Sequence, residues 1–178
     1  MTSAAHRIAA AFAALMLSAP GTGLAVTAPA PAIIPLPLQP VVAAAMRDCS
    51  MRTASGLGYS VLRDGSGPRP GKTDFVLIGY IGYLASSGQV FDQNPGAPLG
   101  LDAVIPGFAE GLQLMPRGSV YRLCVPAALG YGAAGAGRDI PSNADLVFQI
   151  ELLDSKTSAE IEAMHKAQGP ATTNSPTP

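Results

Sequence analysis

The sequence lacks tryptophan altogether and has only two histidines and two cysteines among its 178 residues. His6 lies near the N-terminus and His165 near the C-terminus, so the middle of the chain contains no histidine. This absence excludes Ser-His-Asp and Cys-His hydrolysis within a domain formed by the middle. Two cysteines without a nearby histidine make no zinc site, and the sparse carboxylates form no cluster for a hard cation. We therefore expect neither a metal nor a cofactor.

An excess of charge of one sign is also missing, since the formal net charge is -1. The chain therefore shows no electrostatic footprint for nucleic acid or an anionic membrane. Its apolar run at residues 8–19, IAAAFAALMLSA, is too short for a stable membrane span, which needs ~20 residues. That length, near the N-terminus, is typical of a signal peptide. We expect residues 1–25 to be this signal, cleaved after Ala25 or after Ala19, and the protein to be periplasmic or secreted.

Export makes Cys49 and Cys124 a candidate disulfide, because thiols oxidise readily outside the cytoplasm. In the stretch VYRLCV, Cys124 alternates with Leu123 and shares a face with Arg122. Two interpretations stay open: a bridge, or two unpaired and partly buried thiols.

The spread of proline divides the chain into segments. Proline is frequent in residues 20–40 and in the last nine residues, so residues 26–54 are expected to be a linker and N-terminal extension. A folded domain is expected over 55–154, followed by a short helix and a disordered tail over 155–178. Within the domain, strand patterns cover parts of 56–67, 74–84, 86–92, 119–125 and 145–153.

One short helix is expected at residues 107–115, where Phe108, Leu112 and Met115 share a face. Strands do not alternate with long helices, which argues against a parallel doubly wound sheet. The pattern predicts an α+β domain in which one helix covers one face of an antiparallel sheet. In the last strand we expect Leu146, Phe148, Ile150 and Leu152 to face one way, and Gln149 and Glu151 the other.

Two glycine-rich stretches are interpreted as turns rather than as nucleotide-binding loops. GYGAAG at 130–135 matches a dinucleotide motif, but no helical run follows it before the next strand. GSGPRPGKT at 65–73 has two prolines where a phosphate loop needs backbone N–H donors.

The remaining candidate region, around VIPGFAEGLQLMPRGS at 104–119, is apolar and offers little reactive chemistry. Rotation about an Xaa-Pro bond needs no nucleophile, base or metal. Its barrier of ~20 kcal/mol comes from amide resonance, which a dry pocket can weaken.

From about Gly56 to Leu153 the sequence resembles the FKBP-type peptidyl-prolyl cis/trans isomerases. The resemblance rests on the blocks SGLGYSVLRDGSGPRP, GYIGYLASSGQVFDQ, VIPGFAEGLQLMPRGS, VPAALGYGAAGAG and IPSNADLVFQIELLD, which run in family order. It implies a five-stranded antiparallel sheet wrapped around one short helix, with an apolar pocket between them.

The resemblance also implies roles for single residues. Tyr80, Asp92, Phe108 and Tyr131 would be the catalytic set, with Phe108 as the pocket floor and the Tyr131 hydroxyl on a substrate carbonyl. Substrate would further contact Phe91, Val104, Ile105, Ile140 and Phe148, with the Ile105 N–H facing the bound peptide. The clients implied are proline-containing polypeptides, and the macrolides that bind this family are candidate ligands.

The sequence departs from the family pattern at several points. Phe108 stands where many members have tryptophan, and Gly79 where a larger residue often precedes the pocket tyrosine. The loop expected at 93–100, QNPGAPLG, lacks an aromatic wall residue. Two functions follow: an exported prolyl isomerase that assists protein folding, or a peptide-binding chaperone module of the same fold with little turnover.

Overall fold

The computed structural model describes residues 33–34 and 41–168. The expected signal peptide, much of the proline-rich stretch and the expected disordered tail lie outside these residues. Within them, six strands form one antiparallel sheet in the order β1-β2-β5-β6-β3-β4. The strands are β1 (Met51–Arg52), β2 (Gly58–Arg63), β3 (Phe75–Leu84), β4 (Val90–Gly100), β5 (Val120–Val125) and β6 (Leu146–Lys156).

The predicted α+β class is confirmed, with two corrections to the sheet. It has six strands instead of five in the described part of the chain, because Met51–Arg52 pairs with β2 as a short edge strand. The stretch after Asp92 is not a loop: β4 continues to Gly100 and pairs with β3 along its length. A register shift opposite Gly79 accommodates Pro95 in this strand.

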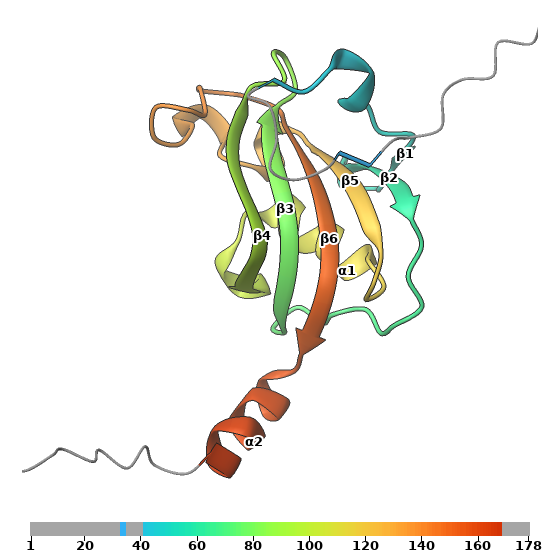
Figure 1. Cartoon of the computed structure of the whole chain (residues 1–178). Helices are drawn as coiled ribbons and strands as arrows, with labels where there is room; N and C mark the ends of the chain where they lie inside the picture. The colour runs from blue at the N-terminus through green and yellow to red at the C-terminus, as the bar shows by residue number, and fades with distance from the viewer. Residues whose placement is uncertain (1–32, 35–40, 169–178) are drawn as a thin grey trace, which may run out of the picture.

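Helix α1 (Pro106–Leu114) covers one face of the sheet, here called the inner face (Figure 1). Proline suits its first turn, where the N–H would have no partner within the helix. Gly111 allows a close approach to β5, since a Cβ there would stand 2.1 Å from Leu123 Cδ1. Phe108, Leu112 and Met115 are all buried. The helix therefore docks its apolar side on the centre of the sheet.

The alternation predicted for β6 is confirmed. Its even-numbered residues belong to the core beneath α1, a set comprising Leu146, Phe148, Ile150 and Leu152. Val147 and Gln149 point to the opposite, outer face, where Val147 packs with Ile81 and Tyr83 of β3. The sheet therefore has a buried apolar layer on each face.

Parts of the N-terminal extension pack on the outer face of the sheet and cover it. Ile34 and Val42 are buried there against the Ile81, Tyr83 and Val147 layer. A disulfide joins Cys49 to Cys124 of β5, and the Tyr83 hydroxyl donates to the Met46 carbonyl at 2.7 Å. The described parts of the range expected as linker and extension thus pack on the domain.

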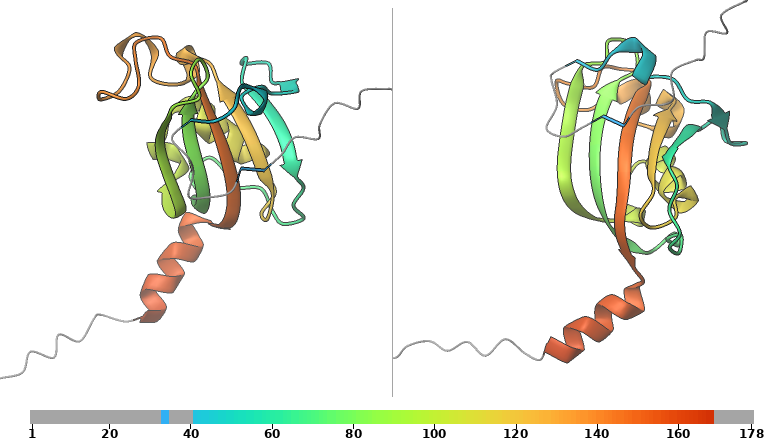
Figure 2. Two further views of the ribbon diagram at one scale, coloured as in Figure 1. Left: turned by 45° about the horizontal axis from the view of Figure 1, so that its top comes forward. Right: turned by 45° about the vertical axis from the view of Figure 1, so that its right-hand side comes forward.

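A second helix, α2 (Ser158–Gln168), projects away from the sheet beyond the end of β6 (Figures 1 and 2). Its first turn is closed by a capping box: Glu160 accepts from the Thr157 N–H at 2.8 Å, and the Thr157 hydroxyl accepts from the Glu160 N–H at 3.2 Å. Neither helix in the described part of the chain has the length and apolar character needed to cross a bilayer.

Candidate active site

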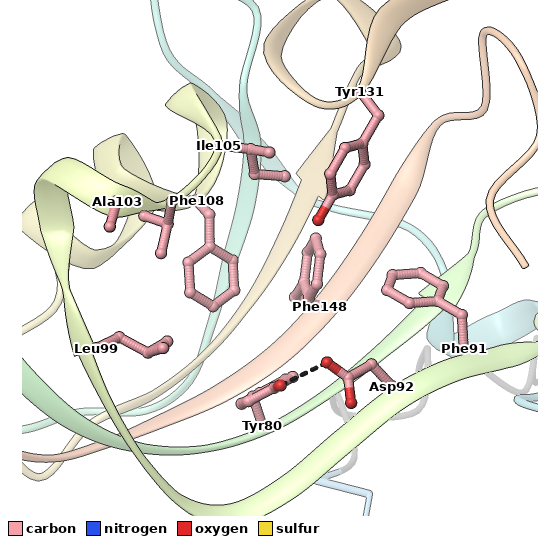
Figure 3. Close-up of a pocket in the computed structure, with 10 residues that line it drawn as sticks. Tyr80, Phe91, Asp92, Leu99, Ala103, Ile105, Phe108, Tyr131 and Phe148 are labelled. Atoms are coloured by element: carbon pink, nitrogen blue, oxygen red, sulfur yellow. Dashed lines mark hydrogen bonds between the residues drawn. The ribbon is translucent and has the colours of Figure 1, made fainter. Parts of the chain in front are cut away.

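A cavity of about 380 Å³ lies between the inner face of the sheet and the N-terminal end of α1 (Figure 3). Small-molecule and peptide side-chain sites commonly have such volumes. Its walls come from β3, β4, β6, α1 and the loops that precede α1 and follow β5. The lining residues are Tyr80, Phe91, Asp92, Leu99, Ala103, Val104, Ile105, Phe108, Tyr131 and Phe148.

Four aromatic rings form the interior of this cavity. The Phe108 ring meets Phe148 edge-on at a centroid distance of 4.9 Å, and Tyr80 at 6.2 Å. Phe148 in turn contacts Phe91 edge-on at 5.6 Å. Edge-to-face contacts of this kind fix the rings relative to one another. Phe108 and Phe148 are almost fully buried, so the cavity has a rigid apolar floor.

Tyr80 and Asp92 lie together on one side of the cavity (Figure 3). They come from paired strands, and the Tyr80 hydroxyl donates to Asp92 Oδ2 at 2.5 Å. Burial, and then the hydrogen bond to Asp92, raises the pKa of Tyr80 above its ordinary value. Tyr80 therefore remains protonated at neutral pH and keeps the carboxylate in place at the rim.

Tyr131 reaches the cavity from the opposite side, on the loop between β5 and β6. Its hydroxyl points toward the rings of the floor (Figure 3), while the side chain is 40% exposed. The loop turns tightly around it, because Gly132 and Gly135 adopt positive φ of 55° and 63°. Only glycine adopts this backbone region readily. A phenol is thus held at the mouth without being buried.

The segment before α1 forms the remaining wall. A 3-10 helix, η2 (Leu101–Ala103), leads into Val104 and Ile105, and Ile105 is the N-cap residue of α1. The Ile105 carbonyl accepts from the Phe108 N–H at 3.0 Å and from the Ala109 N–H at 3.1 Å. The tight entry into the helix brings Ile105 and Phe108 to the same cavity.

The structure brings together eight of the residues that the resemblance assigned to a site: Tyr80, Phe91, Asp92, Val104, Ile105, Phe108, Tyr131 and Phe148. Ile140 does not line the cavity; it is buried in the adjacent core and paired with Ala136 across a tight loop. Leu99 and Ala103 line the cavity and were missed. Recognising 93–100 as a strand would have indicated Leu99, because it pairs with the buried Val76.

The chemistry of this site is limited to packing and hydrogen bonding. Among the described residues that line it, Asp92 carries the only charge, and no histidine, cysteine or lysine is present. The site offers phenol and backbone donors around a water-poor aromatic floor. Such a site can bind an apolar ring and hold its neighbouring carbonyls, and the residues that line it include no serine, cysteine, histidine or lysine.

The aromatic wall depends on the missing side chain of Gly82 in β3. A Cβ there would stand 2.7 Å from the Phe91 ring and 2.8 Å from the Phe148 ring. We expect Gly82→Ala to lower the free energy of unfolding by about 1–3 kcal/mol through overpacking, measured by urea denaturation. Gly96→Ala in β4 is the control, since its added Cβ meets nothing within 4 Å. Equal effects of the two changes would contradict this account of Gly82.

Residues 67–153 match the family model described as FKBP-type peptidyl-prolyl cis-trans isomerase. The chain is 47% identical over 105 residues to the FKBP-type peptidyl-prolyl cis-trans isomerase FkpA of Aeromonas hydrophila, covering 57% of this chain and 38% of that protein. It is 43% identical over 109 residues to the outer membrane protein MIP of Legionella longbeachae, covering 59% and 46%.

Among solved structures, the chain is similar to a peptidyl-prolyl cis-trans isomerase from Pseudomonas syringae pv. tomato. The sequence identity is 38% and the TM-score 0.58, over 60% of this chain and 80% of that one. The chain spans half or less of the length of the two curated relatives. The matched residues 67–153 nevertheless include β3, β4, β5, α1, most of β6 and all the residues that line the cavity, and the chain belongs to the FKBP-type peptidyl-prolyl cis-trans isomerase family.

Proposed function

We propose that this protein catalyses cis/trans isomerisation of Xaa-Pro bonds in polypeptides. The observation that carries the proposal is the aromatic cavity, which provides an apolar floor and hydroxyl groups at its mouth and is lined by no serine, cysteine, histidine or lysine. Isomerisation of an amide breaks no covalent bond, so an apolar floor and hydrogen-bond donors are sufficient for it. The uncatalysed reaction takes tens to hundreds of seconds, slow enough to limit folding.

In the proposed mechanism the proline ring packs on Phe108, bordered by Phe148 and Tyr80. The planar amide has a larger charge separation than the twisted one, because resonance places partial charge on oxygen and nitrogen. A water-poor aromatic site therefore favours the twisted transition state over the planar ground state. Each 1.36 kcal/mol of this difference accelerates the reaction tenfold.

The groups at the mouth would hold the peptide around the proline. In this proposal the Ile105 N–H and the Tyr131 hydroxyl donate to carbonyls of the substrate that neighbour the twisting bond. Fixing these carbonyls restricts which part of the peptide turns during isomerisation. Asp92, held by Tyr80, is the charged residue among those that line the cavity.

We further propose that the protein acts outside the cytoplasm. The N-terminal sequence favours export. The Cys49–Cys124 disulfide is a type of bond that persists in oxidising compartments. One relative is named an outer membrane protein. Clients would be proline-containing polypeptides that fold after export.

A protease-free isomerisation assay on Xaa-Pro tetrapeptides tests the proposed activity. We expect the purified full chain to accelerate the cis-to-trans relaxation, and an FKBP-directed macrolide to abolish the acceleration. No acceleration by a correctly folded chain would reject the enzyme. Binding of unfolded polypeptides without acceleration would instead favour a chaperone module, which the replacement of tryptophan by Phe108 motivates.

Removal of the Asp92 carboxylate is expected to lower kcat/KM about tenfold. The estimate corresponds to a hydrogen bond to a charged group, worth about 1.5–3 kcal/mol. Asp92→Ala leaves the Tyr80 hydroxyl without its acceptor, whereas Asp92→Asn keeps an acceptor and is the matched control. If both residues act through their shared bond, the double variant Tyr80→Phe/Asp92→Ala should be no slower than Asp92→Ala. Fully additive losses would contradict a shared role.

A further inference from the structure

The outer face of the sheet holds a second cavity of about 290 Å³, which shares only Tyr80 with the lining of the aromatic cavity. It opens over β3, β4, β5 and β6, with Gly79, Pro95, Val120, Gln149 and Glu151 among its lining residues. Ile33 and Ile34 of the N-terminal extension complete its wall. In Figure 1 this short blue piece lies on the near face of the sheet, whereas α1 lies behind it. We call this cavity the outer groove.

Gln149 holds the extension by both polar groups of one residue. Its Oε1 accepts from the Ile34 N–H at 2.8 Å, and its Nε2 donates to the Ile34 carbonyl at 2.8 Å. This side-chain amide thus imitates the pair of hydrogen bonds that a neighbouring antiparallel strand would make. Gln149 is only 6% exposed. A buried amide without these partners would be left unsatisfied, which destabilises the chain, so the arrangement favours a bound segment at Gln149.

The Ile34 side chain gives the contact its apolar part. It is 5% exposed and packs in the outer-face layer with Ile81, Tyr83 and Val147. The two kinds of contact together define the ligand chemically. It is an extended polypeptide with an aliphatic side chain at the anchored residue.

Gly79 shapes the floor of the outer groove. It lines the cavity directly, and a Cβ at this position would stand 3.1 Å from the Pro95 carbonyl oxygen. The close approach of the β4 backbone at Pro95 therefore favours glycine at this position of the outer face.

We propose that the surface beside the outer groove, on which Ile33 and Ile34 lie, is a second polypeptide-binding site, whose resident ligand is the Ile33–Ile34 segment of the same chain. The site takes an extended segment through the Gln149 amide and an aliphatic side chain through the Ile81, Tyr83 and Val147 layer. Its anchor and its apolar layer face the side of the sheet opposite the aromatic cavity, although Tyr80 lines both cavities.

The first test is amide hydrogen exchange in the full chain, followed by NMR. We expect the Ile34 N–H to exchange at least tenfold more slowly than in an unstructured peptide. Gln149→Met, which keeps the side-chain volume but removes the amide, should abolish this protection. Gln113→Met is the matched control, since the Gln113 amide bonds to the Ala109 carbonyl within α1. An unprotected Ile34 in the native chain, or protection unaffected by Gln149→Met, would overturn the proposal.

The second test asks whether the groove accepts a ligand in trans. The probe is a labelled peptide, Ala-Ala-Ile-Ile-Ala-Leu, which corresponds to residues 31–36 with both prolines replaced so that the isomerase site does not select it. We expect it to bind the full chain carrying Ile34→Asp at least tenfold more tightly than the native chain. Adding Gln149→Met should remove this binding.

Other outcomes decide against the proposal. Equal binding to the native and Ile34→Asp chains, no binding to either, or binding insensitive to Gln149→Met would each reject a peptide site in the outer groove. Ile34→Ser repeats the test if the aspartate variant does not fold. Concentration-dependent dimers of the native chain that Ile34→Asp dissociates would assign the ligand to a second copy and overturn the intramolecular assignment.

Discussion

Replacement of Phe108 by alanine is expected to reduce kcat/KM for Xaa-Pro peptides about 10-fold to 100-fold. Phe108 forms the floor on which the proline ring packs in the proposed mechanism, and it fixes the rings of Tyr80 and Phe148. Loss of a buried phenylalanine contact removes about 1.5–3 kcal/mol of apolar stabilisation. The transition state would lose both its packing surface and its shelter from water. The measurement is the protease-free isomerisation assay, with activity expressed per folded molecule.

This variant needs a control because Phe108 is also a core residue. A buried Phe→Ala or Leu→Ala change costs about 2–5 kcal/mol of stability. Leu112→Ala lies one helical turn away, is equally buried and does not line the cavity. We expect it to lose comparable stability while keeping kcat/KM within about twofold. If the two variants lose activity equally, Phe108 acts only through the fold and the floor lies elsewhere.

Loss of the Cys49–Cys124 bridge is expected to lower the free energy of unfolding by about 4 kcal/mol. The cysteines are 75 residues apart, and closing so long a loop restricts the unfolded chain strongly in the loop-entropy model. The total stability of a domain is only about 5–15 kcal/mol. The bridge also ties the extension that precedes β1 to β5, so its loss should free that segment from the outer face.

Urea denaturation of the double variant Cys49→Ala/Cys124→Ala measures this effect. The native chain is compared with and without a reducing agent, and the variant should match the reduced native chain. A control treatment of the variant with the reducing agent should change nothing. Equal midpoints for the oxidised native chain and the variant would mean that the bridge contributes no stability.

Local sequence patterns were sufficient to predict the packing of α1 on the inner face of the sheet. Alternation in β6 and the spacing of Phe108, Leu112 and Met115 predicted which side chains meet, because a sheet and a helix have fixed periods. The family motifs then indicated nearly all of the aromatic cavity. These signals are reliable where a single buried face dominates the choice of residues.

The misread elements share a different physical cause. Residues 93–100, which contain Pro95 and Pro98, were predicted to be a loop, yet they continue β4, which is the outermost strand beside β3, and an edge strand tolerates proline. Whether a strand lies at the edge depends on the assembled sheet, so it cannot be predicted from the residue pattern of the strand alone. Leu99 was missed with it. Ile140, assigned to the site by the resemblance, does not line the cavity, and its contact with substrate stays a prediction.

The outer groove escaped sequence analysis because its anchor looks ordinary. Gln149 alternates with apolar neighbours and reads as a solvent-facing residue of a half-buried strand. Only the folded chain shows that its amide is buried and hydrogen-bonded to Ile34, at a sequence separation of 115. A pairing of that range cannot be deduced from one segment.

The two hydrogen bonds at Gln149 also impose a rule of composition on whatever they hold. The anchored residue must supply a backbone N–H, and proline has none. Ile34 is followed directly by Pro35 in the sequence. If the chain shifted by one residue so that proline took the place of Ile34, no N–H would be available to donate to Gln149 Oε1, and that hydrogen bond would be lost. The proposed site on the outer face would thus exclude proline from the anchored position, whereas the proposed isomerase site on the inner face binds proline. The two faces of one sheet would therefore have opposite preferences for proline.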